Sequence, residues 1–282
     1  MPAAATGKPP VILQVLPALQ TGGVERGTVE ISGALQHAGW RSVVVSAGGE
    51  LVRPLSYGKA THIELPVNSK NPFTIWRNAA RLQQLIHTHG INLVHARSRA
   101  PAWSAWLACR STGVPFVTTF HGTYGLENTL KKHYNAIMTR GQRIIAVSRY
   151  IAEHIQTQYG VAPERIRTIP RGVDLTTFNP DNISRHRLFE LVEQWRLPDD
   201  VPILALPGRV TRWKGHHVLL EALALLPHRN FFCLFIGDDT AHPNYRRELE
   251  TRIATLGLND RVRFTGNTSA MTEAYALCNL VI

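Results

Sequence analysis

Cysteine is scarce in this chain, and no stretch of it stays apolar for long. The three cysteines among 282 residues are far apart, at Cys109, Cys233 and Cys278, and no Cys-x-x-Cys pair occurs. This pattern excludes a disulfide framework and a thiolate zinc site, and it favours a reducing compartment. No run reaches the roughly 18 apolar residues that a membrane-spanning helix needs. The sequence therefore predicts a cytoplasmic protein without a transmembrane segment.

Metal-binding and nucleic-acid-binding patterns are missing too, although the chain has 13 histidines. The adjacent pair His216 and His217, and the pair His87 and His89, have spacings that do not bring two imidazoles to one helix face. No metal site is predicted. Helix-turn-helix, zinc-finger and aromatic RNA-binding signatures are absent, so no nucleic-acid partner is predicted.

Acidic residues are few in the first part of the chain. The whole net charge of +11 belongs to residues 1–175, because residues 176–282 hold equal numbers of basic and acidic side chains. Such an asymmetry indicates an anionic partner for the first part. Charge alone leaves a membrane surface, a nucleic acid and a phosphorylated acceptor open.

Strand-like and helix-like segments alternate throughout, which is the pattern of parallel sheets with helices on both faces. The series is interrupted near residues 170–180, where the charge balance also changes. We predict an α/β protein with two Rossmann-like domains, residues 1–175 and 176–282, facing each other across a cleft. Strands are expected at residues 11–16, 41–46, 91–95, 116–120, 143–147, 166–169, 203–206, 231–236, 262–264 and 280–282, with helices at 27–37, 73–89, 102–111, 149–159, 217–226, 245–256 and 272–277.

One loop has the composition of an anion site. Residues 207–215, Pro-Gly-Arg-Val-Thr-Arg-Trp-Lys-Gly, join a predicted strand to a predicted helix and include Gly208, Arg209 and Lys214. Free N–H groups at a helix start, a permissive glycine and two cations suit a phosphate or a diphosphate. The segment is neither a P-loop nor a dinucleotide-binding fingerprint. On residue types alone, a capped turn with solvated cations explains it equally well.

The first domain has its own glycine-rich loop at the expected cleft. Gly22 and Gly23 follow the first strand and would let a ligand approach the backbone, while Glu25 lies in the first turn of the helix. A plain tight turn is the alternative. His121 follows the strand 116–120 and so lies at the carboxyl edge of the sheet, where ligands are usually bound, although an ordinary packing role stays open.

Three further features have both structural and functional interpretations. Ser148 follows a strand and is either a helix cap or an acceptor-side group. Asp238, after Gly237, is more typical of a turn than of a metal site. Residues 126–143 are predicted to form a basic, partly apolar helix that suits a membrane interface, or else an ordinary solvated face. Its cations include Lys131, Lys132 and Arg140.

Taken together, these motifs resemble the retaining GT-B glycosyltransferases of glycosyltransferase family 4. They occur in the order typical of that family, and the likeness covers nearly the whole chain from Val11. No single motif is specific, but the ordered set is. The motifs are Gly22-Gly23-Val24-Glu25, His121-Gly122, Val147-Ser148, Gly172-Val173-Asp174, Gly208-Arg209, Lys214-Gly215, Gly237-Asp238 and Gly266.

The resemblance implies that the second domain grips a nucleotide sugar and that the first holds the acceptor. Arg209 and Lys214 would contact the donor diphosphate, Gly23 would approach it from the first domain, and His121 would lie beside the transferred sugar. The implied catalytic residues are His121, Arg209 and Lys214; the donor-binding residues are Gly22, Gly23, Gly208, Arg209, Lys214, Gly237 and Asp238; and the acceptor-side or membrane residues are Glu25, Ser148, Lys131, Lys132 and Arg140.

The implied reaction moves a hexose from UDP- or GDP-hexose to a lipid-linked or cell-envelope glycan acceptor with retention. It needs no cofactor or metal, because preorganised cations stabilise the departing diphosphate more than the ground state. Residues 118–124 and 170–174 look most like lipopolysaccharide-core members. The resemblance therefore implies a peripheral protein on the inner face of the cytoplasmic membrane, in contact with an anionic surface.

The chain departs from the family pattern in three places. The paired-glutamate motif of the family lies beyond the strand that corresponds to Asn279–Ile282, so the sequence is expected to be truncated and its second domain incomplete. Arg171 stands where many relatives have asparagine, and Asp239 where many have glycine. Two alternatives stay open: a catalytically inactive fragment that acts as a membrane-associated binding protein, and a sugar-nucleotide epimerase of GT-B fold.

Overall fold

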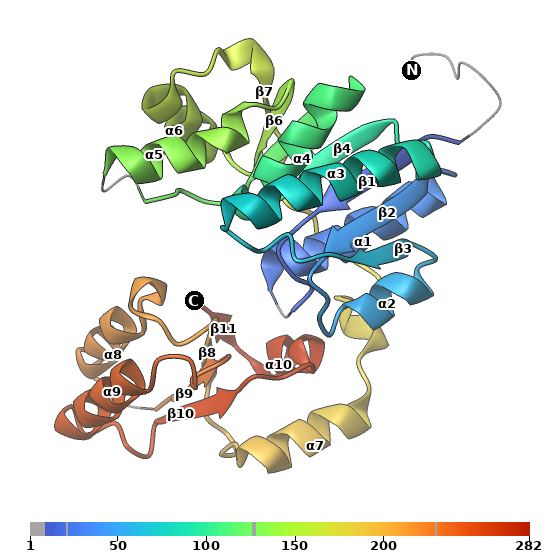
Figure 1. Cartoon of the computed structure of the whole chain (residues 1–282). Helices are drawn as coiled ribbons and strands as arrows, with labels where there is room; N and C mark the ends of the chain where they lie inside the picture. The colour runs from blue at the N-terminus through green and yellow to red at the C-terminus, as the bar shows by residue number, and fades with distance from the viewer. Residues whose placement is uncertain (1–8, 21, 126–127, 229) are drawn as a thin grey trace. The chain divides into compact units, whose positions relative to one another are not determined.

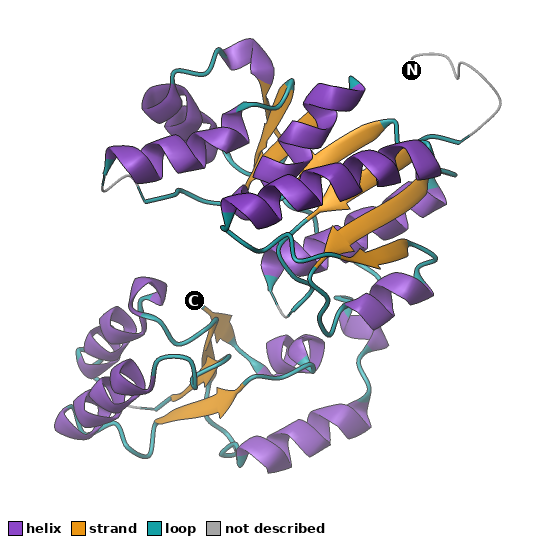
Figure 2. Cartoon of the chain, in the orientation of Figure 1, coloured by secondary structure: helices purple, strands orange, loops and turns teal. Residues whose placement is uncertain are grey.

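A computed structural model describes residues 9–20, 22–125, 128–228 and 230–282. The chain divides into two compact units, Met1–Gly172 and Val173–Ile282. Figure 1 follows the chain through both, and Figure 2 shows that each is a sheet with helices around it. The division falls three residues before the boundary predicted after Leu175. The cleft between the two stays a prediction.

The first unit is built on a seven-stranded sheet of order β3-β2-β1-β4-β5-β6-β7, in which every pairing is parallel. Its strands are β1 Val11–Val15, β2 Arg41–Ser46, β3 Thr61–Glu64, β4 Leu93–Ala96, β5 Phe116–Phe120, β6 Arg143–Ala146 and β7 Ile166–Thr168. Its helices are α1 Gly23–His37, α2 Val52–Tyr57, α3 Pro72–His89, α4 Arg99–Thr112, α5 Thr129–Asn135 and α6 Arg149–Tyr159, with the 3₁₀ turns η1 Ala136–Thr139 and η2 Pro163–Arg165.

Successive side chains of the strands point to opposite faces of the sheet, so they pack in two cores. Leu13 of β1 is fully buried on the face that also packs against Leu82 of α3 and Ala105 of α4. On the other face, Val44 of β2 packs in a smaller cluster with Leu55 of α2. Because all seven strands run the same way, their carboxyl ends lie along one edge, and the loops after β1, β4, β5 and β6 emerge there.

The second unit has a four-stranded parallel sheet of order β10-β9-β8-β11. Helices α8 and α9 contribute to one core cluster, and α7 and α10 to the other, so both faces are covered. The strands are β8 Ile203–Pro207, β9 Phe232–Ile236, β10 Val262–Gly266 and β11 Leu280–Val281, and the helical elements are η3 Pro180–Asn182, α7 Arg185–Trp195, η4 Arg212–Lys214, α8 His216–Ala224, α9 Pro243–Thr255 and α10 Met271–Leu277.

The predicted α/β fold with two parallel-sheet domains is confirmed, but one strand and two α-helices of the described residues were missed. Strand β3 lacks an apolar run because it is an edge strand and is only partly buried. The short helix α2 and the helix α7 were also not predicted. Among the residues that the structure describes, no helix is both long and apolar enough to cross a membrane.

The prediction of one continuous basic helix over residues 126–143 is wrong. Residues 126 and 127 lie outside the described part, α5 covers only Thr129–Asn135, and η1 replaces the next turn. The carbonyl groups at the end of this segment are used elsewhere. Thr118 donates to the carbonyl of Met138 at 2.5 Å, and Arg165 donates to those of Thr139 and Gly141, each at 2.6 Å. These tertiary hydrogen bonds end the helical ladder before β6 begins.

Candidate functional site

The loop after β1 leads directly into α1. Gly22 is the N-cap of this helix, without a side-chain hydrogen bond, and Gly23 is its first residue. A side chain at either position would meet a neighbour: at Gly22 the carboxylate of Glu25, and at Gly23 the Nη1 of Arg171, 2.5 Å from an added Cβ. A side chain at either position would therefore displace the end of the Glu25 or Arg171 side chain. Glu25, in the first turn, complements the helix dipole.

Two arginines meet beside α1. Arg97 follows β4, is only 6% exposed, and donates from Nη1 to Oε1 of Gln14 at 3.1 Å. Arg171, which is exposed, donates to the carbonyl oxygen of Gly23. A Cβ added to Gly27 would lie 3.1 Å from the Nη2 of each guanidinium, so both reach the same turn of the helix. Burial, followed by the charge of Arg171, lowers the pKa of Arg97 to about 10.

His121 is where the sequence predicts it, directly after β5. Both of its ring nitrogens are buried, and neither has a hydrogen-bond partner among the described residues. Its pKa is lowered to about 3, first by burial and then by the charges of Arg97 and Arg171. The imidazole is therefore neutral at physiological pH and can still donate one hydrogen bond and accept another.

The sequence analysis missed Arg97, although a usable signal was present. The expected strand 91–95 ends two residues before it, so Arg97 lies at the carboxyl edge where binding residues gather. An arginine in a loop is normally read as solvated, and only the packing shows that this one is buried. His95, which lies on β4 two residues before Arg97, is also buried and forms a 2.7 Å hydrogen bond with Thr119.

Ser148 is the N-cap of helix α6. Its Oγ accepts a 3.2 Å hydrogen bond from the backbone N–H of Ile151 at the start of α6. This geometry is the structural alternative that the sequence left open, and an acceptor-side role stays a prediction.

The basic residues of the expected membrane helix do not join His121. Lys131 and Lys132 are exposed on α5, and Arg140 is exposed between η1 and β6. Because Arg140 comes just before β6 while His121 comes just after the parallel strand β5, the two belong to opposite edges of the sheet.

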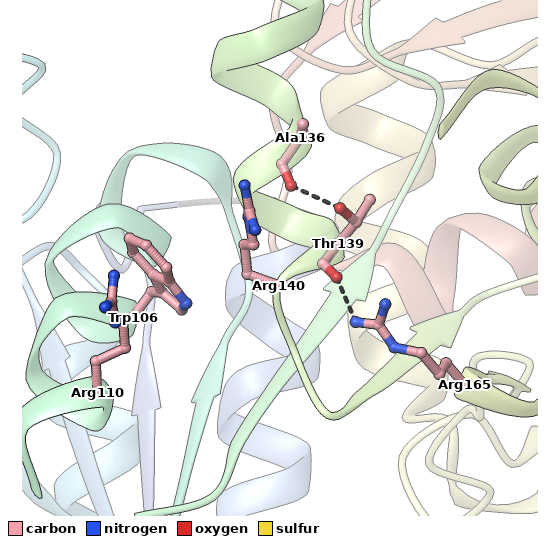
Figure 3. A pocket seen from close by; sticks show the side chains of 6 residues that line it. All are labelled: Trp106, Arg110, Ala136, Thr139, Arg140 and Arg165. Carbon is pink, nitrogen blue, oxygen red and sulfur yellow. Dashed lines mark hydrogen bonds between the residues drawn. The ribbon is translucent and has the colours of Figure 1, made fainter. Parts of the chain in front are cut away.

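Arg140 instead borders a separate cavity of about 450 Å³ (Figure 3). The guanidinium carbons of Arg110 and Arg140 lie 5.0 and 5.7 Å from the ring centre of Trp106, within cation–π range. Arg165 closes another side of the cavity through its bond to the carbonyl of Thr139, drawn dashed in Figure 3. This basic cavity lies on the amino-terminal side of β6 and β7, away from the glycine loop.

In the second unit, backbone hydrogen bonds join the loop after β8 to the loop after β9. The N–H of Gly208 donates to the carbonyl of Ile236 at 2.7 Å, and the N–H of Val210 donates to that of Asp238 at 2.8 Å. Gly237 has φ +149°, and an added Cβ there would collide with the backbone carbonyl of Gly208. Backbone packing thus requires glycine at position 237, and the positive φ of Gly208, +151°, favours glycine there.

The two cations of this loop have different surroundings. The methylenes of Lys214 pack 3.5 Å from the position of a Gly208 Cβ, and its Nζ lies 4.5 Å from the ring centre of Trp213. Arg209 is exposed, and its charge is one of the causes that lower the pKa of Asp238. The loop therefore presents Arg209 to solvent, while the stem of Lys214 is held against the backbone.

Asp238 forms its own turn. Its Oδ1 accepts hydrogen bonds from the N–H and the hydroxyl of Thr240, at 3.0 and 2.7 Å, and these bonds are the main reason for its lowered pKa. Its neighbour Asp239 pairs with Arg246. Within the described ranges, no group of three His, Cys, Asp or Glu side chains gathers as a metal site would require.

Two parallel-sheet units, each with a glycine loop at the carboxyl edge, have the architecture of the GT-B glycosyltransferases. Residues 21–177 match the model of Glycosyltransferase Family 4, and residues 189–282 match that of Glycosyl transferases group 1. The chain therefore belongs to glycosyltransferase family 4.

Solved structures and curated proteins are similar to it. A glycosyltransferase from Rickettsia africae ESF-5 is 41% identical with a TM-score of 0.86, over 98% of this chain and 73% of that one. Alr3699/HepE of Anabaena, solved with UDP and glucose, shares the fold with 20% identity and a TM-score of 0.80, over 96% and 73% of the two chains.

A D-inositol 3-phosphate glycosyltransferase of Xylanimonas cellulosilytica is 30% identical over 187 residues, which are 61% of this chain and 44% of that protein. The chain thus spans less than half the length of this curated relative.

Proposed function

We propose that the protein transfers a hexose from a nucleotide diphosphate sugar to an acceptor, with retention and without a metal ion. The loop between β8 and α8 carries this proposal. It presents Arg209 and Lys214 at the start of a helix whose N-cap, Gly215, makes no side-chain bond. As the anomeric C–O bond breaks, negative charge grows on the departing diphosphate. Fixed cations and backbone N–H groups stabilise that charge more than the ground state.

In the first unit, His121 supports the same reaction. A neutral imidazole whose two nitrogens lack a partner among the described residues suits a hydrogen bond to a hydroxyl of the transferred sugar, and the start of α1 offers backbone N–H groups to the diphosphate. Membership of the family and the sugar nucleotide bound by the Anabaena protein agree with such a donor. Retention is inferred from the family, with the acceptor hydroxyl attacking on the face that the diphosphate leaves.

For the acceptor, we propose a cell-envelope glycan or a lipid-linked sugar, as in lipopolysaccharide synthesis, at the inner face of the cytoplasmic membrane. The basic first unit supports this location, as does α5, where exposed Lys132 follows Leu130, which is 84% exposed. Flotation with anionic and neutral liposomes tests it. Lys131→Glu/Lys132→Glu should weaken binding to anionic vesicles, and equal flotation on both lipids would refute the membrane role.

Donor binding provides the direct test of the catalytic proposal. Titration with UDP and GDP should show saturable binding of one of them, and Arg209→Ala or Lys214→Ala should weaken it. In turnover with a nucleotide sugar and an acceptor, either variant should lose about 2 to 4 kcal/mol of transition-state stabilisation. Arg247→Ala, on α9, serves as a matched surface control. Unchanged nucleotide affinity and turnover in both loop variants would refute the assignment.

Two alternatives predict different products from the same mixtures. A binding protein without catalysis would bind the nucleotide sugar and release no nucleoside diphosphate. An epimerase would change the configuration of the donor sugar without needing an acceptor. Release of nucleoside diphosphate that depends on an added acceptor separates the transferase from both.

A further inference from the structure

The cavity beside Trp106 carries three positive charges and no negative one. Its volume is about 450 Å³, and its lining includes the arginines Arg110, Arg140 and Arg165, which come from α4, the end of η1 and η2 (Figure 3). Neither Asp nor Glu lines it, and no carboxylate of the described residues pairs with these guanidiniums. A concave surface with charges of one sign raises the local concentration of counter-ions.

The indole ring of Trp106 positions two of the cations. The guanidinium carbons of Arg110 and Arg140 lie 5.0 and 5.7 Å from its centre, and both are attracted to the ring by the cation–π interaction. Trp106 itself meets the ring of Trp103 edge-on, with 6.4 Å between the ring centres. The two arginines are thus oriented by an aromatic ring, which leaves their N–H groups available to a ligand.

Hydrogen bonds between elements fix the walls of this cavity. The Nη2 of Arg165 donates to the carbonyl oxygens of Thr139 and Gly141, each at 2.6 Å, and so joins η2 to the end of η1. Thr118 of β5 donates to the carbonyl of Met138 at 2.5 Å. Carbonyl oxygens carry no net charge, so Arg165 remains an uncompensated cation at the cavity. A ligand would meet a largely pre-formed site, which lowers the entropy cost of binding.

The fold itself accounts for two of the three arginines. Arg110 lies in the last turn of α4, where a cation complements the helix dipole, and Arg165 serves η1 as described. Arg140 has neither role, because it is exposed and its guanidinium contacts the ring of Trp106. Placing it beside two other cations is unfavourable in the absence of an anion. An anion that contacts the guanidiniums removes this repulsion.

We propose that this cavity binds the phosphate group of a ligand that is neither the sugar donor nor the acceptor. Planar guanidiniums match phosphate oxygens in pairs, and the volume accommodates a phosphate with a small attached group. The proposal goes beyond the transfer reaction. Arg140 precedes β6, whereas His121 follows the neighbouring parallel strand β5, and the five residues of β5 span roughly 15 Å.

The bound phosphate joins α4, η1 and η2 at the edge of the sheet away from the glycine loop. Two sources carry this chemistry: the headgroup of a phospholipid and a free phosphate ester. Both present phosphate oxygens to the same three guanidiniums, so the site is defined by the phosphate and the experiment separates the sources.

Inorganic phosphate is the probe, and the indole N–H of Trp106 is the reporter. Chain labelled with ¹⁵N-tryptophan is titrated with phosphate at constant ionic strength, and the Trp106 signal is assigned with Trp106→Phe. We expect a saturable shift of this signal, half complete at a phosphate concentration on the order of 1 to 10 mM. Trp213, whose ring centre lies 4.5 Å from the Nζ of Lys214, reports separately on the donor loop.

Variants separate a built site from general surface charge. Arg110→Gln and Arg140→Gln each remove an exposed side chain and should weaken phosphate binding about tenfold, with an unchanged circular dichroism spectrum. Arg140→Lys keeps the charge but loses the planar fork, so it should bind phosphate more weakly than wild type. Arg77→Gln is the matched control, because it also removes an exposed arginine beside an aromatic ring, 5.8 Å from the centre of Phe73, and should leave the affinity unchanged.

Flotation with vesicles distinguishes the two sources. The vesicles contain phosphatidic acid, which displays a phosphate monoester, in phosphatidylcholine. Weaker flotation of Arg140→Gln than of Arg77→Gln identifies a phospholipid headgroup, since both variants change the net charge equally. Equal flotation of the two, with the phosphate response of Trp106 lost only in Arg140→Gln, identifies a free phosphate ester. Either result supports a phosphate site in the cavity.

Two results would overturn the proposal. One is the absence of a Trp106 shift up to roughly 20 mM phosphate, including the case in which only Trp213 responds. The other is equal phosphate affinity in wild type, Arg110→Gln, Arg140→Gln and Arg77→Gln, which would assign the binding to general surface charge.

Discussion

Acid stability depends on a buried histidine in the first unit. His95 lies within β4, is buried with 9% of its surface exposed, and shares a 2.7 Å hydrogen bond with Thr119. Its pKa is lowered from 6.5 to about 3, first by burial and then by the charges of Arg97 and His121. The folded protein therefore keeps this imidazole neutral under mildly acidic conditions, whereas the unfolded chain takes up a proton.

The sign and the size of the effect follow from this difference. Because the folded-state pKa is lowered, the unfolded state binds more protons than the folded state below pH 6.5. The contribution of His95 to the free energy of unfolding is therefore fully present above pH 6.5 and decreases as the pH falls toward 3. In this window, lowering the pH by one unit reduces the free energy of unfolding by about 1.4 kcal/mol per group. Lowering the pH from 6.5 to 4.5 should therefore cost about 2 to 3 kcal/mol through His95 alone.

Urea unfolding at several pH values between 7 and 4.5, followed by circular dichroism, measures this dependence. His95→Gln should be less stable than wild type at pH 7 but should lose less stability on acidification. His87→Gln, which removes an exposed imidazole from α3, is the matched control. Parallel pH profiles for wild type and His95→Gln would show that the buried imidazole is not the acid-sensitive group.

Three further substitutions or modifications test the packing of the site. Gly237→Ala should lower the melting temperature more than Gly215→Ala. Both glycines have positive φ, but only at Gly237 would an added Cβ meet the backbone of Gly208, 2.6 Å from its carbonyl carbon. Equal decreases in melting temperature would refute the close approach. Ser148→Ala should cost about 1 kcal/mol in unfolding free energy through loss of the α6 cap, and an unchanged unfolding free energy would refute the capping role. Cys109 should react with a thiol reagent at pH 8 only as fast as the chain opens, since burial raises its pKa to about 12, and rapid labelling of the folded protein would contradict its burial.

Much of the architecture was determined by the sequence itself. Strand β2 was predicted with its observed bounds, Arg41–Ser46, because an unbroken β-branched run admits little else. The loop from Gly208 to Lys214 was recognisable because glycine and two cations follow a strand and precede a helix. Helix α6 was also predicted at its observed bounds, Arg149–Tyr159, and Ser148, given from the sequence as a possible cap, is its N-cap.

Only the tertiary structure decided which polar side chains are enclosed. Nothing local distinguishes Arg97 from a solvated loop arginine; its burial results from packing between β4 and α1, which are distant in sequence. The same holds for the segment of α5 and η1, whose basic pattern predicted one long helix, because Thr118 and Arg165 bond to the carbonyl groups of Met138 and Thr139 in η1. Local periodicity determines which segments become strands and helices, whereas the charge balance of a site depends on groups that meet only when those elements pack.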